Sequence, residues 1–227
     1  MTIGLIGVGR MGKAIAARLA NNFDVTVFDR DTVRLLAVAD EYGLQAANSI
    51  EEMSDLGTII LAVPDREVIS CIKIFNQLQK PLIVINIATN VDRHVLRETP
   101  AKHVQCISAK IVGQADEMML GQRPVIIVDE RPPELVPLAA EIFRAAGEVI
   151  IGRADMVSLI NTIAAEKILT AAVSIEETLL QQNITDPAII KTAIRQVAVG
   201  TLKAYADSNL GPFAREIVQA VRAKMRK

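Results

Sequence analysis

The stretch GLIGVGRMGKAIAARLA, residues 4–20, decides the fold of this chain. Residues 2–6 are mostly apolar and predict a buried strand. Apolar side chains then recur at four-residue spacing over residues 10–20, which predicts a helix. A strand that passes through a glycine turn directly into a helix is the start of a βαβ unit.

Three glycines occupy the turn in the pattern GxGxxG: Gly7, Gly9 and Gly12. Gly7 permits the tight turn, Gly9 lets the backbone approach a pyrophosphate, and Gly12 lets the helix pack closely against the strand. The free N–H groups of the helix N-terminus attract phosphate. The turn therefore predicts a dinucleotide site that also includes the intervening residues Val8, Arg10 and Met11.

An acidic residue is expected about 20 residues after the first glycine, where it binds the adenine ribose. Asp29, at the end of the second predicted strand, has this place. A carboxylate there repels a 2′-phosphate and favours NAD over NADP. Arg30 follows directly and leaves NADP open, because its guanidinium is able to hold that phosphate or to stack on adenine.

Two loops that follow apolar strands are expected to complete the cofactor site, because ligands lie at the carboxyl ends of parallel strands. Their side chains are small, which leaves room for the ribose and the nicotinamide. The first loop contains Ala62, Val63 and Pro64, and the second contains Ile87, Ala88 and Thr89.

Strands and helices alternate along residues 1–152, which predicts an α/β fold with a doubly wound parallel sheet. We expect this part to be the NAD(P)-binding Rossmann domain. The further predicted strands are residues 24–28, 44–47, 58–63, 81–87, 104–108, 125–128 and 149–151.

Several residues mark the expected ends of helices. Asp31, Ser49 and Asp186 have the chemistry of N-caps. Pro132 and its neighbour Pro133 suit the start of a helix that would end near Gly147.

Residues 153–227 show no strand pattern and predict a smaller all-helical domain. Its helices are expected over residues 156–181, from Pro187 to about 206, and after Gly211. These few helices are not enough to bury one another's apolar faces. We expect this domain to bind the substrate and to form a homodimer.

Composition narrows the functional classes. The formal net charge is −1, so no excess of basic residues indicates a nucleic-acid partner. The two cysteines lack a CxxC spacing and predict buried free thiols in a cytoplasmic protein. No metal-binding motif is present, and no unbroken stretch of about 18 apolar residues predicts a membrane span.

The first part of the chain resembles the 6-phosphogluconate and β-hydroxyacid dehydrogenase superfamily, together with pyrroline-5-carboxylate reductase. The resemblance is carried by residues 4–20 and by VTVFDRD (25–31), TIILAVPDREV (58–68) and PLIVINIAT (81–89). It implies a Rossmann domain that holds NAD or NADP and a helical domain that closes over the nicotinamide.

The stretch from 152 to 177 resembles the long helix of the β-hydroxyacid dehydrogenases, which carries a catalytic Lys and, three residues later, an Asn. The Asn falls on Asn161, but Ser158 stands where the family has the Lys. Lys110, predicted just after the strand 104–108, is a candidate replacement base if desolvation lowers its pKa. A solvated loop lysine is the alternative.

Two functions remain open. The resemblance implies an oxidoreductase that moves a hydride between nicotinamide and a small carbonyl, imine or hydroxy-acid substrate. The missing Lys favours a non-catalytic NAD(P)-binding sensor or partner protein. A polar cluster built from Asn161, Ser158 and Lys110 would favour the enzyme, whereas the sequence names neither the substrate nor the direction of reaction.

Overall fold

The computed structural model describes residues 1–226, and they form two compact units. Unit 1 is Met1–Thr162 and unit 2 is Ile163–Lys227. The division falls inside a helix that was expected to belong wholly to the second domain. The first turns of that helix join unit 1 because Val157 is buried against Ile127.

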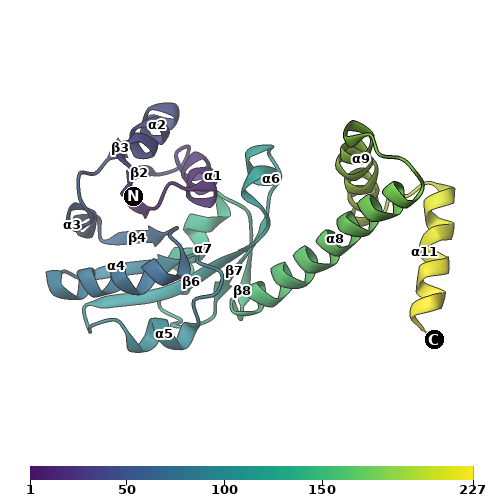
Figure 1. Ribbon diagram of the computed structural model, residues 1–227. Helices are drawn as coiled ribbons and strands as arrows, with labels where there is room; N and C mark the ends of the chain where they lie inside the picture. The colour runs from purple at the N-terminus through teal and green to yellow at the C-terminus, as the bar shows by residue number, and fades with distance from the viewer. Residues whose placement is uncertain (227) are drawn as a thin grey trace. The chain divides into compact units, whose positions relative to one another are not determined.

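Unit 1 is built on an eight-stranded sheet with the order β3-β2-β1-β4-β5-β6-β7-β8 (Figure 1). The first six positions of this order are those of a dinucleotide-binding Rossmann sheet. The strands are β1 (Thr2–Ile6), β2 (Asp24–Phe28), β3 (Gln45–Ala46), β4 (Thr58–Leu61), β5 (Leu82–Asn86), β6 (Val104–Val112), β7 (Val125–Asp129) and β8 (Glu148–Gly152).

The sheet is mostly parallel, as predicted, with one antiparallel pair. β7 pairs antiparallel with β6, whereas β8 runs parallel to β7. A parallel connection needs a crossover that packs a helix on the sheet. The link between β6 and β7 carries only the short helix α6 (Ala115–Met119), so the chain turns back on itself.

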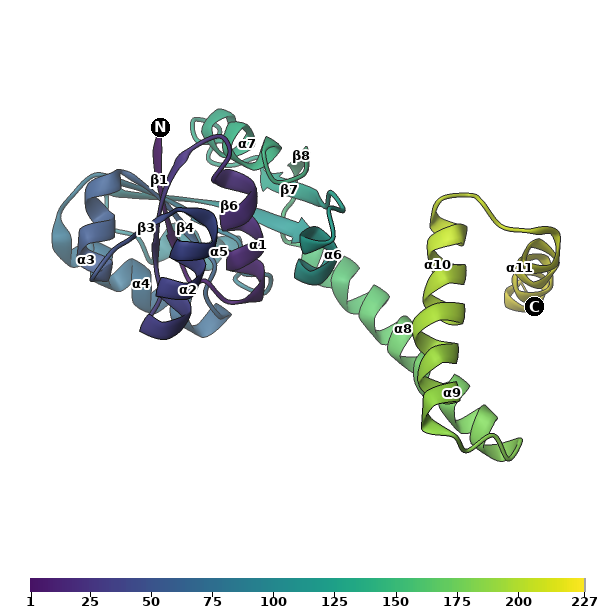
Figure 2. The same ribbon diagram turned by 90° about the horizontal axis from the view of Figure 1, so that it is seen from above.

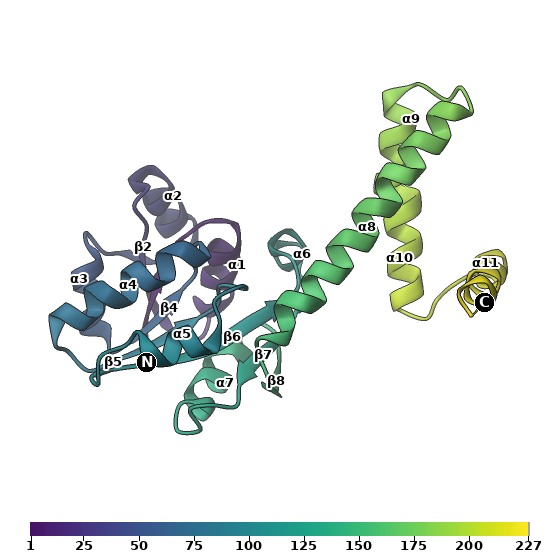
Figure 3. The ribbon, with the colours of Figure 1, turned by 60° about the horizontal axis from the view of Figure 1, so that its bottom comes forward.

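Helices cover both faces of this sheet and close two cores. On one face, α1, α2 and α7 pack over a cluster that includes Leu5, Ile15 and Phe143. On the other face, α4 and α5 cover Ile59, Ile72 and Leu96 (Figure 3). These helices are α1 (Arg10–Leu19), α2 (Thr32–Tyr42), α3 (Ile50–Met53), η1 (Ser54–Leu56), α4 (Asp65–Leu78), α5 (Arg93–Glu98) and α7 (Val136–Arg144).

The three expected N-caps are confirmed. The side chains of Asp31, Ser49 and Asp186 each accept a hydrogen bond from a backbone N–H in the first turn of α2, α3 and α9. Side-chain capping satisfies N–H groups that the helix leaves without a partner.

The helix expected from Pro132 to Gly147 is shorter than predicted. α7 begins at Val136, because a residue that precedes a proline is disfavoured in the helical region and Pro132 precedes Pro133. Gly147 does not cap the helix. A Cβ added there would lie 2.4 Å from the carbonyl oxygen of Pro124, so close packing requires the glycine.

Unit 2 consists of helices, as predicted. They are the C-terminal part of α8 (Met156–Gln181), α9 (Pro187–Thr192), the π-helical segment η2 (Ala193–Ala198), α10 (Val199–Ala206) and α11 (Pro212–Met225). Figure 2 shows α9 and α10 following one another as one rod, which is the single helix expected up to residue 206. Among the described residues of unit 2, Ile190 alone is buried.

The expected absence of a membrane span stays a prediction. One helix, α8, is long and apolar enough to cross a membrane by length and composition, with a mean hydropathy of 1.4 over its most apolar window. Polar residues separate its apolar ones, so it contains no unbroken apolar stretch of that length. A core helix of a water-soluble assembly satisfies the same two criteria.

Candidate functional site

A cleft of about 470 Å³ opens at the carboxyl ends of β1 and β4, beside the glycine turn. The end of β2 forms its far side through Phe28 and Asp29. Of the residues predicted to bind the cofactor, it is lined by Gly7, Gly9, Arg10, Met11, Asp29, Arg30, Ala62, Val63 and Pro64.

The three glycines differ in what their missing side chains allow. Gly7 has φ +94°, and a Cβ there would lie 2.5 Å from the carbonyl oxygen of Ala62. A Cβ on Gly12 would lie 1.8 Å from the carbonyl oxygen of Gly7. A Cβ on Gly9 would meet nothing within 4 Å. Gly7 and Gly12 therefore serve the fold, whereas Gly9 leaves the backbone open to a ligand.

The N-terminus of α1 faces this opening without a side-chain cap. Gly9 is its N-cap residue, no side chain accepts a bond from its first turn, and that turn carries no acidic residue. Free N–H groups and the positive end of the helix dipole bind phosphate. Open backbone next to an uncapped helix is the arrangement that a pyrophosphate requires.

Asp29 is fixed by three groups around its carboxylate. Its Oδ2 accepts a 2.8 Å hydrogen bond from the Val8 N–H, and its Oδ1 accepts one of 2.9 Å from the Asp31 N–H. Arg34 places a guanidinium nitrogen 3.7 Å from Oδ2. The carboxylate thus ties the end of β2 to the glycine turn and presents a fixed acceptor at the cleft.

Six lining residues were not predicted: Ile6, Phe28, Arg34, Ile50, Glu67 and Cys71. The apolar ones belong to strands and helices whose residues all looked like core. Arg34 and Glu67 lie in the first turns of α2 and α4. Their place at the cleft depends on how those helices pack, which the sequence does not show. Burial raises the pKa of the Cys71 thiol to about 11, which keeps it protonated at neutral pH.

The family that fits this geometry is described as the NAD binding domain of 6-phosphogluconate dehydrogenase, and its model matches residues 2–154. The chain belongs to this family. NAD or NADP is therefore the cofactor of this domain, as the sequence predicted. The cleft fits such a dinucleotide, because the open space at Gly9 receives phosphate and the apolar walls accept adenine.

Known proteins resemble the chain in sequence and in fold. Pyrroline-5-carboxylate reductase of Escherichia coli (strain K12) is 30% identical over 43% of this chain and 43% of its own length, which is less than half of that relative. The structure of a pyrroline-5-carboxylate reductase from Coxiella burnetii has a TM-score of 0.70 at 17% identity, covering 96% of this chain and 84% of that one. Mycobacterium tuberculosis 3-hydroxyisobutyrate dehydrogenase has a TM-score of 0.63 at 17% identity, covering 85% and 69%. The likeness to these two structures is one of fold.

The other predicted cofactor residues lie outside the cleft. Ile87 and Ala88 are buried, and Thr89 is half-buried at the end of β5. Val8 and Gly12 are also enclosed, Val8 by the core and Gly12 by the Gly7 carbonyl. Burial by neighbouring strands was not visible in the sequence of these loops.

A second hollow of about 460 Å³ adjoins the glycine turn on its other side. It shares Arg10 and Met11 with the first cleft and is completed by Gln114, Ala115 and Asp116. The structure thus brings the start of α6 next to the dinucleotide cleft.

Ser158 and Asn161 lie on the first turns of α8, where Ser158 contacts the loop after β5 and Asn161 contacts the end of β6. The Ser158 hydroxyl donates to Asn90 Oδ1 at 2.6 Å, and Asn90 Nδ2 donates to Asp65 Oδ2 at 2.9 Å. The Asn161 amide donates to the Ile111 carbonyl oxygen at 3.0 Å. Each side chain keeps further hydrogen-bonding capacity, because a hydroxyl also accepts and an amide has a second N–H and an oxygen.

Lys110 is neither a loop residue nor solvated. It lies within β6, which extends to Val112, and its side chain is only 2% exposed. Its ammonium group donates to Asp155 Oδ1 and to the Val91 carbonyl oxygen, both at 2.8 Å. Asp155 immediately precedes α8, so the pair fixes the start of that helix to the sheet.

Three further polar residues share this region of the sheet. Asn86 and Asp129 are buried at the ends of β5 and β7, and Ser108 is buried within β6 beside Asn86. Burial raises the pKa of Asp129 above its ordinary value, although the Arg131 N–H and the charge of Arg93 oppose the shift. No motif marks these three residues, because they come together only through the pairing of strands distant in the chain.

No group of three or more His, Cys, Asp or Glu residues within positions 1–226 is placed to hold a metal ion.

Proposed function

We propose that the protein is an NAD-dependent oxidoreductase acting on a small carbonyl, imine or hydroxy-acid substrate. The observation that carries the proposal is the glycine turn, where Gly9 leaves the backbone open beside an uncapped helix N-terminus. When bound, the dinucleotide donates or accepts a hydride at its nicotinamide ring.

Asp29 supports NAD as the preferred form. Its carboxylate is held at the cleft by the Val8 and Asp31 N–H groups, so it stays in place to accept ribose hydroxyls. The same negative charge opposes a 2′-phosphate.

The substrate side is formed by residues near the second hollow and the start of α8. We assign Asn161 and Ser158 to orienting the substrate oxygen or nitrogen, through the hydrogen-bonding capacity that their present contacts leave. Lys110 has a positioning role in this proposal, because its ammonium group is enclosed by Asp155 and the Val91 carbonyl.

The proposed organisation follows from burial. Residues 1–152 would hold the cofactor, and residues 153–227 would bind the substrate and pair with a second copy. The described helices of unit 2 leave large apolar side chains exposed, among them Leu169 at 64% and Val173 at 53%. A cytoplasmic homodimer would cover them.

A non-catalytic NAD(P)-binding sensor is the second candidate. It is favoured by Ser158 at the position of the family's Lys, and by the enclosure of Lys110 away from any cleft. Neither residue presents a free base to a substrate.

Titration of the purified chain with NADH and NADPH, followed by a screen of small carbonyls, imines and hydroxy acids at 340 nm, tests both candidates. Binding with turnover supports the oxidoreductase. Binding without turnover on any substrate supports the sensor. Failure of a folded protein to bind either nucleotide would exclude both.

A further inference from the structure

Charged side chains from the end of β2, from α2 and from the start of α4 line one end of the cleft. Glu67, in the first turn of α4, forms an ion pair with Arg30, with 2.9 Å between its Oε2 and a guanidinium nitrogen. Both side chains line the cleft together with Asp29. Glu67 is the more enclosed partner, with a side chain 26% exposed against 70% for Arg30.

The second arginine at this end is also paired. Arg34 contacts Asp31 at 2.8 Å and lies 3.7 Å from Asp29. Arg66, next to Glu67, approaches that carboxylate at 3.7 Å. Arg30 and Arg34, the two arginines that line this end of the cleft, therefore each already have a carboxylate partner.

We propose that Glu67 is a specificity-determining residue, which keeps Arg30 in an ion pair and so makes the cleft select NAD over NADP. The inference rests on the proposed function. It assigns part of the preference for NAD to Glu67, which belongs to a different βαβ unit from Asp29. A 2′-phosphate carries about two negative charges at neutral pH and needs an unpaired guanidinium. Glu67 withholds Arg30 by holding its guanidinium in the ion pair.

The test is a set of fluorescence titrations of the full chain with NADH and NADPH at about 0.15 M salt, where long-range charge effects are screened. The variants are Glu67→Gln, Arg30→Gln and the double variant. Glu67→Gln keeps the shape of the side chain and removes its charge. We expect it to tighten NADPH binding about threefold to tenfold and to change NADH binding less than twofold.

Arg30→Gln shows whether the gain in NADPH affinity comes from the release of Arg30 or only from the loss of a negative charge at position 67. The gain in NADPH affinity should vanish in the double variant, because no arginine remains to be released. Glu41→Gln is the matched control, since Glu41 on α2 forms a 2.7 Å pair with Lys13 on α1 but does not line the cleft. It should leave both affinities unchanged.

Three outcomes would overturn the inference while NADH binding stays intact: an unchanged ratio in Glu67→Gln, a gain that persists without Arg30, or a wild type that prefers NADPH. If the wild type binds neither nucleotide, the proposed function fails and the inference fails with it. The two failures are thus distinguishable by NADH binding alone.

Discussion

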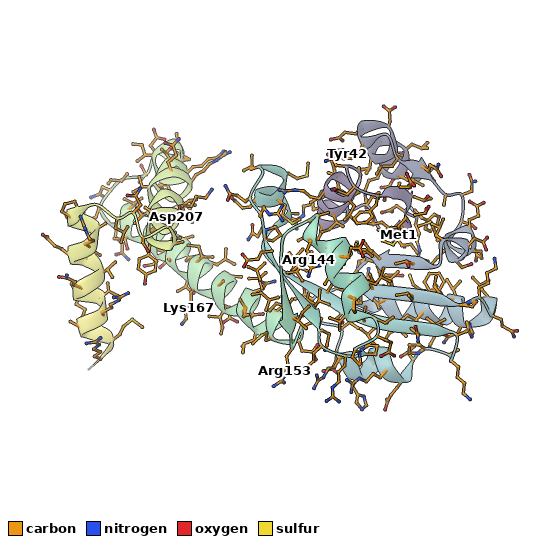
Figure 4. The ribbon with its side chains drawn as sticks, turned by 180° about the vertical axis from the view of Figure 1, so that it is seen from behind. Met1, Tyr42, Arg144, Arg153, Lys167 and Asp207 are labelled. Carbon is orange, nitrogen blue, oxygen red and sulfur yellow. The ribbon has the colours of Figure 1, made fainter. Side chains whose placement is uncertain are left out.

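The two units of the chain differ in how they bury apolar side chains. Unit 1 closes a core on each face of its sheet, with residues such as Ile3, Leu5 and Phe143 fully enclosed. Unit 2 has Ile190 as its one buried residue within the described positions. Figure 4 shows side chains packed between the layers of unit 1, whereas those near Lys167 on α8 point outward.

This contrast separates two sources of stability. A sheet covered on both faces satisfies its backbone and its apolar side chains within one chain. Helices without a closed core depend on contacts from elsewhere, because tertiary packing supplies most helical stability. Unit 1 therefore closes its own cores, whereas unit 2 leaves large apolar side chains exposed, which is the basis of the proposed homodimer.

The largest effect is expected where unit 1 is packed most tightly. Gly12→Ala would place a Cβ 1.8 Å from the Gly7 carbonyl oxygen and should lower the free energy of unfolding by about 4 kcal/mol. Gly9→Ala meets no atom within 4 Å and should lower stability by at most about 1 kcal/mol, the cost of replacing Gly by Ala at an N-cap. The same methyl should weaken NADH binding at least about tenfold. Urea unfolding and NADH titration of both variants give the comparison, which equal stability losses would contradict.

The next effect concerns the polar anchor of α8. Asp155→Asn leaves the buried ammonium of Lys110 without its carboxylate and should cost about 3 kcal/mol. Lys110→Met combined with Asp155→Asn should recover most of that loss, because no buried charge remains unpaired. Urea unfolding of the single and double variants measures the coupling. Additive losses in the double variant would show that the pair does not anchor the helix.

Unit 2 is tested at its exposed face. Leu169→Glu should weaken self-association at least about 100-fold, because burying a carboxylate in an apolar interface is costly. Val33→Glu is the control, since Val33 is 82% exposed on α2 in unit 1. Sedimentation velocity over a concentration series gives the dissociation constants. A wild type that stays monomeric would remove the proposed homodimer.

The smallest effect is a pH dependence inside unit 1. Because the pKa of Asp129 is raised in the folded protein, its contribution to stability is present at low pH and is lost as the pH rises through that value. Asp129→Asn should therefore stabilise the protein at pH 7 by up to about 1 kcal/mol and have little effect near pH 4. Thermal unfolding between pH 4 and pH 8 checks this. A benefit that is constant with pH would show that charge is not the cause.

Local signals in the sequence were sufficient for most of the fold. The glycine turn, the alternation of strands and helices, and the caps at Asp31, Ser49 and Asp186 all act within a few residues, and the structure contains each of them. The antiparallel direction of β7 could not be predicted in this way, because it depends on how a short connection packs against the sheet.

The residues of the candidate site also fall into two groups, those that local sequence shows and those that depend on distant partners. Gly9 and Asp29 were recognisable because the turn and the strand end place them, and both line the cleft. Glu67 and Asp155 were missed because each gains its role from a partner distant in the chain, Arg30 and Lys110. Lys110 was misplaced for the same reason, since nothing in its neighbours showed that β6 continues to Val112.

The sequence by itself determined the alternation of strands and helices in the first part, the dinucleotide turn and the helical character of the C-terminal part. Short-range geometry decides these features, and the residues that encode them are adjacent in the chain. Only the tertiary structure decided which charges meet. Whether Lys110 is solvated or buried, and whether Arg30 is free or held by Glu67, depends on contacts between elements that no local pattern records.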